Sequence, residues 1–466
     1  MNSFLKNLSW LLLLNLLVKP IWIFFIDREV QNRIGYEAYG SYFAVLNLSY
    51  VLFFMSDAGL SNMINQQLAK REAVNLKQLF RIKASLLLSY FICLSFIAWL
   101  THIPNWTILL YIILIQVFTS VFLFLRSIIT AHQYFYADAW FSVIDKLLMI
   151  LICGMALYGG FRNHFTLIAF LQIQSLCTAL AALAAAAFLF SRQRRMSTGP
   201  QLQNIFQLTF PFALAVVLMS MHYRLDAFLL ERMHFHGPTE AGIYAAAYRL
   251  LDASNMVGYL GASFLVPFLA RNWNDRKLID ATILDLRHGL MFFAIGITSF
   301  CLVFAPWLQN LLYHTSNGYH TEVIQLTIAV LPAYFLTHIY GSIFTANRQF
   351  KPFIVILLSC VLINIILNLI LIPSYGAKGC CISAIMSQYV CALACYFVAT
   401  KKYTLHKGIF SLGVYILCAL FITAFFYLAP SFIKNVWIIL ASGALMILAI
   451  LATQLSFGKK YIPSRR

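Results

Sequence analysis

Long apolar runs, separated by short polar segments, follow one another along the whole sequence. A lipid bilayer has a hydrocarbon core about 30 Å thick, which an α-helix crosses with roughly 20 apolar residues. About fourteen runs approach that length. Because 62% of the 466 residues are apolar and only 10% are charged, a set of soluble domains with charged surfaces is excluded. We therefore expect an all-α integral membrane protein.

Each run predicts one membrane-spanning helix, whereas a β-barrel would show alternating segments of about ten residues. The stretch 179–190 is continuously apolar and rich in Ala and Leu, which suits a helix. The first run has no small-residue cleavage site after it and is expected to be a retained helix. The expected spans are 8–26, 37–57, 84–102, 107–128, 139–159, 165–190, 206–230, 241–269, 286–305, 323–345, 353–372, 379–400, 409–428 and 435–455.

The longest connections between these helices lie near 57–83 and 191–205, and the second is the expected boundary between two halves of six helices. The expected parts are an N-terminal lobe over 1–195, a C-terminal lobe over 196–402, and two further helices with a tail over 403–466.

A short internal repeat supports this division. The pattern Gly-x-Tyr-x-Ala occurs at 40–44, in the second expected helix, and again at 242–246, in the eighth. Both helices have the same expected orientation, so the repeat is parallel, as in two lobes related by an axis along the membrane normal. Chance similarity within a low-diversity apolar sequence is the alternative.

The basic residues follow the membrane topology and account for the formal net charge of +18. Cytoplasmic loops carry an excess of Lys and Arg, and with the N-terminus inside, about 23 fall in cytoplasmic segments and about six outside. We predict that both termini are cytoplasmic, and that the charge serves membrane lipids and not nucleic acid. The residues behind this prediction include Lys70, Arg71, Lys77, Arg81, Lys83, Arg192, Arg194, Arg195, Arg271, Arg276, Lys277, Arg287, Lys401, Lys402, Lys407, Lys459, Lys460, Arg465 and Arg466.

No sequence element indicates a cofactor. All ten cysteines lie within expected helices, and none is spaced as a metal or redox motif, so we interpret them as packing residues. The chain has no long soluble insertion and no Gly-rich phosphate loop of the Walker type. We therefore expect no bound metal or nucleotide, and no direct use of ATP.

Several cations lie within the expected spans. Placing a charged side chain at the centre of a membrane helix costs about 2.5–3.5 kcal/mol, so such a side chain usually faces a wet cavity or a partner. The cations are Lys19, Arg126, Lys146, Arg224 and Arg249. Because they outnumber what internal pairing requires, we predict that they line a cavity and bind an anionic substrate. Phosphate suits such cations, and a lipid diphosphate is a membrane-soluble anion that needs a protein to cross.

Three of these cations also have a simpler interpretation. Lys19 shares a face with Asn15 beside Pro20, which favours a kinked cavity wall, but a lysine there can also snorkel to the interface. Arg126 approaches the cytoplasmic end of its helix and can be an interface anchor. Arg249 can be neutralised by Asp252, three residues further on.

Three residues are candidates for coupling to a proton or sodium gradient. His222 and Asp226 are one turn apart on the seventh expected helix and share a face, while Arg224 points elsewhere. Asp57 ends a stripe on the second helix that also contains Asn47, Tyr50 and Phe54. Structural pairing is the alternative for these groups.

Asp145 and Lys146 are adjacent in the sequence and diverge by about 100° around a helix. We therefore expect each of them to find its partner on another helix.

Several short motifs, in this order, resemble polysaccharide-biosynthesis flippases of the O-antigen type, within the superfamily that also holds multidrug extruders and lipid II flippases. They are Gly35-Tyr36-Glu37-Ala38-Tyr39-Gly40-Ser41-Tyr42, Asp57-Ala58-Gly59-Leu60-Ser61, Arg224-Leu225-Asp226, Gly242-Ile243-Tyr244-Ala245-Ala246-Ala247-Tyr248-Arg249-Leu250, Asn364, Asn368 and Ile372-Pro373-Ser374-Tyr375-Gly376-Ala377-Lys378-Gly379. Each motif is degenerate, but their order and spacing cover most of the chain.

The resemblance implies two six-helix lobes around a central cavity, two extra C-terminal helices, and a transporter that is not an enzyme. It implies alternating access that carries a polyprenyl-diphosphate-linked oligosaccharide from the inner to the outer leaflet of a bacterial inner membrane. Polysaccharide-assembly proteins are the implied protein partners. The glycan itself is not specified by any motif.

Three other interpretations compete with this one. A multidrug extruder of the same superfamily would favour acidic cavity residues, whereas the excess here is basic. A membrane glycosyltransferase or ligase would need a catalytic site in a large outer loop, and the longest outer segment, 306–322, offers only Glu322, His314 and His320. A scaffold without transport would not need intramembrane charges.

Overall fold

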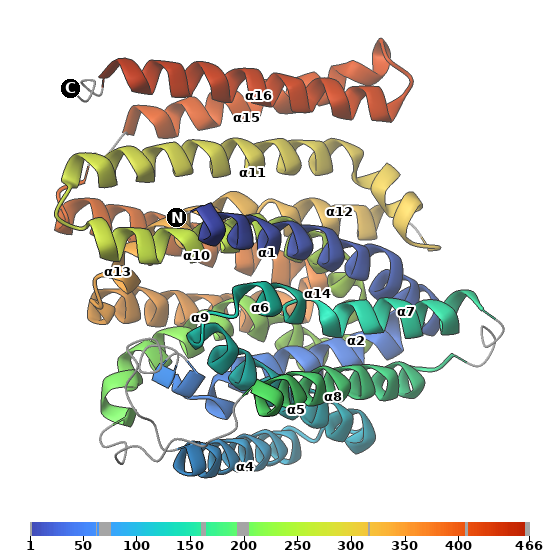
Figure 1. Cartoon of the computed structure of the whole chain (residues 1–466). Helices are drawn as coiled ribbons and strands as arrows, with labels where there is room; N and C mark the ends of the chain where they lie inside the picture. Colours follow the sequence, from blue (N-terminus) through green and yellow to red (C-terminus); the bar gives the residue numbers. More distant parts are fainter. Residues whose placement is uncertain are drawn as a thin grey trace. The chain divides into compact units, whose positions relative to one another are not determined.

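The computed structural model describes residues 2–61, 63–64, 76–159, 165–192, 205–315, 317–405 and 409–461. Within these residues the chain is helical and has no strand (Figure 1). The prediction of an all-α membrane fold is therefore confirmed. Some of the basic residues used for the topology lie outside the described residues: Lys70, Arg71, Arg194, Arg195, Lys407, Arg465 and Arg466.

The chain divides into two compact units, Met1–Gly242 and Ile243–Arg466. The first unit contains α1 (Asn2–Ile21), the π-helix η1 (Trp22–Asp27), α2 (Arg28–Leu52), the 3₁₀-helix η2 (Phe53–Ser56), α4 (Leu76–Leu100), α5 (Trp106–Ala131), α6 (Phe135–Phe141), α7 (Ile144–Tyr158), α8 (Leu167–Arg192) and α9 (Ile205–Met233). The expected boundary at 195/196 lies outside the described residues, and the three-part division stays a prediction.

The second unit contains all but the first turns of α10 (Gly237–Asn272), followed by α11 (Arg276–Leu312), α12 (Gly318–Ile328), α13 (Leu331–Ala346), α14 (Phe350–Lys402), α15 (Ile409–Leu428), η4 (Ala429–Ser431) and α16 (Val436–Tyr461). In this unit α13 packs on α14, and α11 packs on α12, α13, α15 and α16.

Eleven helical segments of the described residues are long and apolar enough to cross a membrane. Two of them, Leu13–Ser56 and Phe350–Lys402, are 44 and 53 residues long, and each covers two expected spans. Each is interrupted by a glycine with positive φ, Gly35 at +83° and Gly376 at +55°, a region that residues with a Cβ rarely enter. The expected count of about fourteen crossings stays a prediction.

The two glycines of the sequence repeat meet at a close helix crossing in the first unit. A Cβ added to Gly40 would lie 1.8 Å from the Pro238 carbonyl oxygen, and one added to Gly242 would lie 2.0 Å from the Tyr36 carbonyl oxygen. Each oxygen belongs to the residue four positions before the opposing glycine, so the contact is reciprocal. Gln31 Nε2 also donates to the Gly242 carbonyl at 2.7 Å. Only glycine permits this approach of α2 to the start of α10.

Arg287, which the sequence places among cytoplasmic basic residues, is instead fully buried in α11 of the second unit. Its Nη1 donates to the Tyr340 hydroxyl at 2.9 Å, and its guanidinium lies 5.9 Å from the Tyr415 ring. Arg287 therefore ties α11 to α13 and α15. None of the ten cysteines forms a disulfide, and eight of them are buried, which suits packing residues.

Candidate functional site

Four of the five predicted cavity cations belong to the first unit, and each lies within electrostatic range of another one or of Tyr50 in α2. The Arg224 guanidinium lies 5.4 Å from the Tyr50 ring, and Lys146 is within electrostatic range of Tyr50. Lys19 is within electrostatic range of Lys146, Asp145 and Arg126. We call Tyr50, Lys19, Arg126, Lys146 and Arg224 the Tyr50 cluster. It joins side chains from α1, α2, α5, α7 and α9.

Two cations of the Tyr50 cluster are paired with carboxylates. Arg126 Nε donates to Asp138 Oδ1 at 2.9 Å, from α5 to α6. Lys146 Nζ lies 3.1 Å from Asp145 Oδ2. The expectation that Asp145 and Lys146 find partners on other helices is therefore wrong, because both lie in the first turn of α7, where the long lysine side chain can reach back to its neighbour.

Lys19 forms no direct ion pair with a carboxylate of the described residues. It lies one turn beyond Asn15, whose Nδ2 donates to Ser142 Oγ at 2.8 Å and so links α1 to the end of α6. Pro20 directly follows Lys19, and the chain continues as the π-helix η1. Such π segments are frequent at functional sites because they redirect side chains. Lys19 is thus a half-buried ammonium with free donors.

Arg224 is positioned by two residues of α2. Its Nη1 lies 3.5 Å from Asn47 Oδ1, and Asn47 is itself buried and donates to the Phe43 carbonyl at 2.8 Å. The second contact is the Tyr50 ring. The stripe through Asn47 and Tyr50, predicted from spacing, therefore does face Arg224 of α9.

Asp57 lies apart from that stripe. The helix changes to the 3₁₀-helix η2 after Leu52, so the expected α-helical spacing fails before Asp57 is reached. Asp57 Oδ1 instead accepts from Lys83 Nζ at 2.9 Å, and Lys83 also donates to Ser120 Oγ and to the Ser56 carbonyl, at 2.7 and 3.0 Å. We call Lys83, Asp57, Ser56 and Ser120 the Lys83 cluster.

Lys83 was missed as a site residue because it was assigned to a cytoplasmic connection. Helix α4 begins at Leu76, and the Lys83 side chain is only 3% exposed. One signal pointed to it: Lys83 directly precedes the apolar run 84–102. A lysine in that position can extend along the helix in either direction.

Asp226 and His222 are both buried in α9, each 2% exposed, whereas Arg224 between them is partly exposed. The prediction that Arg224 points away from the other two is consistent with this difference. Whether His222 and Asp226 act together stays a prediction.

Arg249 belongs to α10 in the second unit and is partly exposed. It is described with that unit and is not part of the Tyr50 cluster. In the predicted outer segment, Glu322 forms an ion pair with Lys378. The Glu322 carboxylate, one of the few groups that a catalytic site in this segment would need, is therefore engaged in an ion pair.

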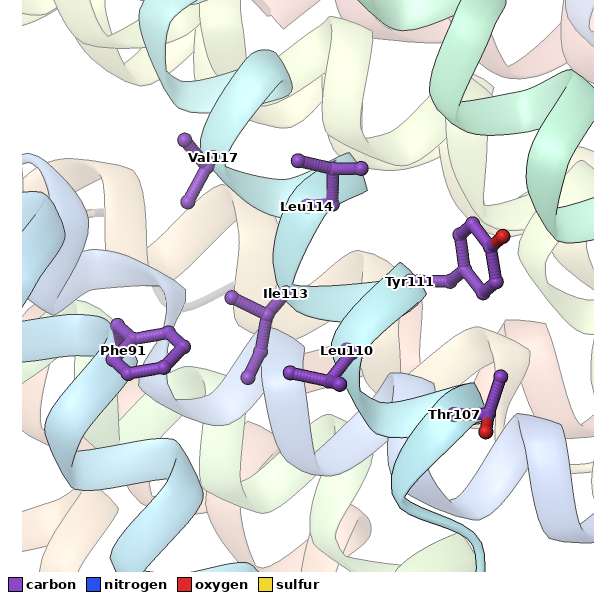
Figure 2. A pocket seen from close by; sticks show the side chains of 7 residues that line it. All are labelled: Phe91, Thr107, Leu110, Tyr111, Ile113, Leu114 and Val117. Carbon is purple, nitrogen blue, oxygen red and sulfur yellow. The ribbon is translucent and has the colours of Figure 1, made fainter.

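Two open pockets of the first unit lie elsewhere. One groove of about 560 Å³ runs along α5 and is mostly apolar, with Thr107 and Tyr111 as its polar residues (Figure 2). It is lined by Phe91, Thr107, Leu110, Tyr111, Ile113, Leu114 and Val117. The second, of about 670 Å³, is formed by the middle of α2 and the beginnings of α5 and α8, and includes Glu37 and Asn105. Neither contains a residue of the Tyr50 cluster.

The chemistry available to the Tyr50 cluster is binding of an anion. Arg126 is paired with Asp138 and Lys146 with Asp145, Asp27 is within electrostatic reach of Lys146, and Lys19 keeps donors that no carboxylate takes directly. Two of the cations are guanidiniums, which can hold phosphate oxygens as a bidentate fork, and two are ammoniums, which act as point charges. Among the described residues, no group of three or more His, Cys, Asp or Glu side chains is arranged to hold a metal ion.

Comparison with known proteins adds a family and a fold. A family model described as "Polysaccharide biosynthesis protein" matches residues 4–273. The capsular polysaccharide biosynthesis protein CapF of Staphylococcus aureus is 26% identical over 202 residues, which are 42% of this chain and 49% of that protein. The match thus spans about half the length of that relative.

Several solved membrane transporters share the fold at low sequence identity. Lipid II flippase MurJ, in an inward closed conformation, has a TM-score of 0.74 at 14% identity, covering 95% of this chain and 98% of that one. An inward-facing multidrug resistance MATE family transporter of the MOP superfamily has a TM-score of 0.65 at 12% identity, covering 84% and 94%. A MOP superfamily transporter from Pyrococcus furiosus, described as having a binding pocket of reverse polarity, has a TM-score of 0.61 at 11% identity, covering 86% and 94%.

Proposed function

The chain belongs to the polysaccharide biosynthesis protein family, and on that premise we propose that it carries a polyprenyl-diphosphate-linked oligosaccharide from the inner to the outer leaflet of a bacterial inner membrane. The resemblance seen in the sequence motifs is confirmed by this membership. The chain is a multi-pass membrane protein with the fold of MOP superfamily transporters. Beyond the family and the fold, we propose the substrate, the direction of transport and the cytoplasmic position of both termini.

The observation that carries the proposal is the Tyr50 cluster. A cation within a membrane span is costly and persists where it has a function or a partner. Lys19 makes no direct ion pair with a carboxylate among the described residues, and Arg224 lies beside it in the chain of cations that passes through Tyr50. A diphosphate would bring the missing negative charge, and its lipid and sugar parts would require the membrane protein around it.

Alternating access would use the crossing of Gly40 and Gly242. By the proposed topology, both glycines lie toward the outer side of the membrane, so their contact closes that side while the cavity receives its cargo. A crossing made by two glycines brings backbones together without interlocking side chains. Such a contact can separate and re-form as a unit during each cycle.

We propose that an ion gradient or the membrane potential drives the empty transporter back to its starting conformation, because the sequence has no nucleotide-binding element. Asp226, with His222 one turn away, is the first coupling candidate. Asp57 is the second, although its ion pair with Lys83 supports a structural role as well. Flipping of labelled lipid-linked sugar in proteoliposomes tests this: a rate unaffected by imposed pH, sodium and voltage gradients, and unchanged in Asp226→Asn, would remove the coupling proposal.

The central test is an inventory of lipid-linked glycans, by mass spectrometry, in a strain that lacks the gene. The proposal expects a polyprenyl-diphosphate-linked oligosaccharide to accumulate on the cytoplasmic side and to disappear when the gene is restored. Unchanged lipid-linked glycans, together with increased sensitivity to organic cations, would instead support a multidrug extruder.

The topology has its own test, which needs no substrate. A cysteine at Gln203, a position outside the described residues, should react with a membrane-impermeant reagent only after the cells are opened. Labelling of intact cells would contradict the proposed orientation.

A further inference from the structure

A polar stripe on α10 in the second unit is not part of the proposed diphosphate site. Asp252, Asn255 and Tyr259 follow one another at spacings of three and four residues, so they share one face of this 36-residue helix. Arg249 begins the same stripe. Asn255 and Tyr259 lie near the middle of a candidate membrane span, Gly237–Asn272, where lipid offers no hydrogen bonds.

Tyr259 is exposed near the middle of a candidate membrane span, and contact with lipid does not explain this exposure. Its side chain is 67% exposed, and its hydroxyl has no hydrogen-bond partner among the described residues. A phenol facing hydrocarbon would leave that hydroxyl unsatisfied, so tyrosines in membrane proteins usually place it at a wet surface. Sharing a face with Arg249 and Asp252 indicates that Tyr259 faces water-filled space.

The neighbouring helix α13 adds a hydrogen-bonding group beside the ring. His338 Nε2 lies 3.0 Å from Asn255 Oδ1, and the His338 ring stands edge-on to Tyr259 at 6.3 Å between centroids. Gly258 allows α13 to pack this closely on α10, because a Cβ at that position would lie 2.4 Å from the Phe335 ring. The Asn255 amide nitrogen makes no hydrogen bond to the described residues and is free to donate.

We propose that Tyr259, Asn255 and His338 form a sugar-binding subsite that contacts the glycan of the transported lipid. A pyranose ring has apolar C–H faces, which fit against an exposed aromatic ring, and hydroxyls at its edge, which both donate and accept hydrogen bonds. The three side chains supply that combination without a net charge. The inference rests on the proposed function, and it assigns the neutral part of the same cargo to the second unit.

The test compares two probes on the purified full chain in nanodiscs. One is the lipid-linked oligosaccharide pool extracted from the strain that lacks the gene, and the other is a polyprenyl diphosphate without sugar. Tyr259→Ala should weaken binding of the oligosaccharide pool about three- to tenfold and leave binding of the bare diphosphate unchanged. Tyr259→Phe keeps the ring and should stay within about twofold of wild type.

Tyr427→Ala is the matched control, since Tyr427 is 74% exposed on α15 of the same unit and should affect neither probe. Asn255→Ala gives a second reading and should weaken only the oligosaccharide pool. Equal losses for both probes, or no loss for either in Tyr259→Ala, would overturn the sugar subsite while leaving the proposed function intact. Wild-type protein that binds neither probe would overturn the proposed function, and this subsite with it.

Discussion

The Lys83 cluster and the Tyr50 cluster belong to the same unit, and each contains a cation paired with a carboxylate, yet they differ in how completely their cations are satisfied. Lys83 is 3% exposed and donates to a carboxylate, a hydroxyl and a carbonyl, which uses all three ammonium protons. Lys19 is half-buried and has no direct carboxylate partner among the described residues.

This difference separates a structural ion pair from a site that can accept a ligand. A saturated buried cation has no donor left, and replacing one partner leaves the other charge uncompensated. A cation with free donors beside other cations gains most from an incoming anion. The two clusters therefore predict opposite responses to mutation, which can be measured separately as stability and as transport.

The largest expected effect is on stability, at Lys83. Lys83→Met removes the only ammonium that Asp57 is seen to contact in the described residues and should cost about 3–5 kcal/mol of unfolding free energy. Thermal unfolding in detergent measures it. Lys19→Met is the matched control and should cost about 0.5 kcal/mol or less. Similar losses at the two lysines would erase the distinction between the clusters.

The next largest effect is on transport, at Lys19 and Arg224. A hydrogen bond to a charged group contributes about 1.5–3 kcal/mol, so Lys19→Ala and Arg224→Ala should each weaken binding of the diphosphate roughly ten- to a hundredfold. Surface glycan export should be lost while protein abundance stays normal. If export persists in both variants, Lys19 is a snorkelling residue and Arg224 a structural one.

A smaller effect is expected where the repeat glycines cross. Gly242→Ala forces a methyl group against the Tyr36 carbonyl and should destabilise the closed crossing by about 1–3 kcal/mol. Cysteine accessibility at Ser41 would report the opening as faster labelling. Gly289→Ala is the control, because a Cβ there meets nothing within 4 Å. Equal labelling in the two variants would show that the crossing does not hold this side closed.

The smallest effect concerns salt. Partly exposed charges are screened over about 10 Å at 0.1 M ionic strength, whereas buried pairs are screened much less. Raising salt should therefore weaken binding of a polyprenyl diphosphate to wild-type protein a few-fold, without changing the unfolding temperature. A parallel decline of both quantities would mean that the Lys83 pair is as open to solvent as the Tyr50 cluster.

The single-helix predictions were reliable where the helix stayed regular. Residues on one face of α2, Asn47 and Tyr50, do face the same partner, Arg224. The prediction failed at Asp57, because the chain had already changed to a 3₁₀-helix. It failed again at Asp145 and Lys146, where side-chain length outweighed the angle between positions.

The membrane class and the helical fold follow from the sequence alone, since apolar run length is a local property. The tertiary structure was needed to find the buried cations Lys83 and Arg287 and to show which charged groups lie near one another. Lys19, Arg126, Lys146 and Arg224 come from four helices, and the burial of Lys83 depends on Asp57 and Ser120 from two other segments. Helical periodicity orients a residue around its own axis, but the packing of one helix against another sets whether a charge finds a partner or is left for a ligand.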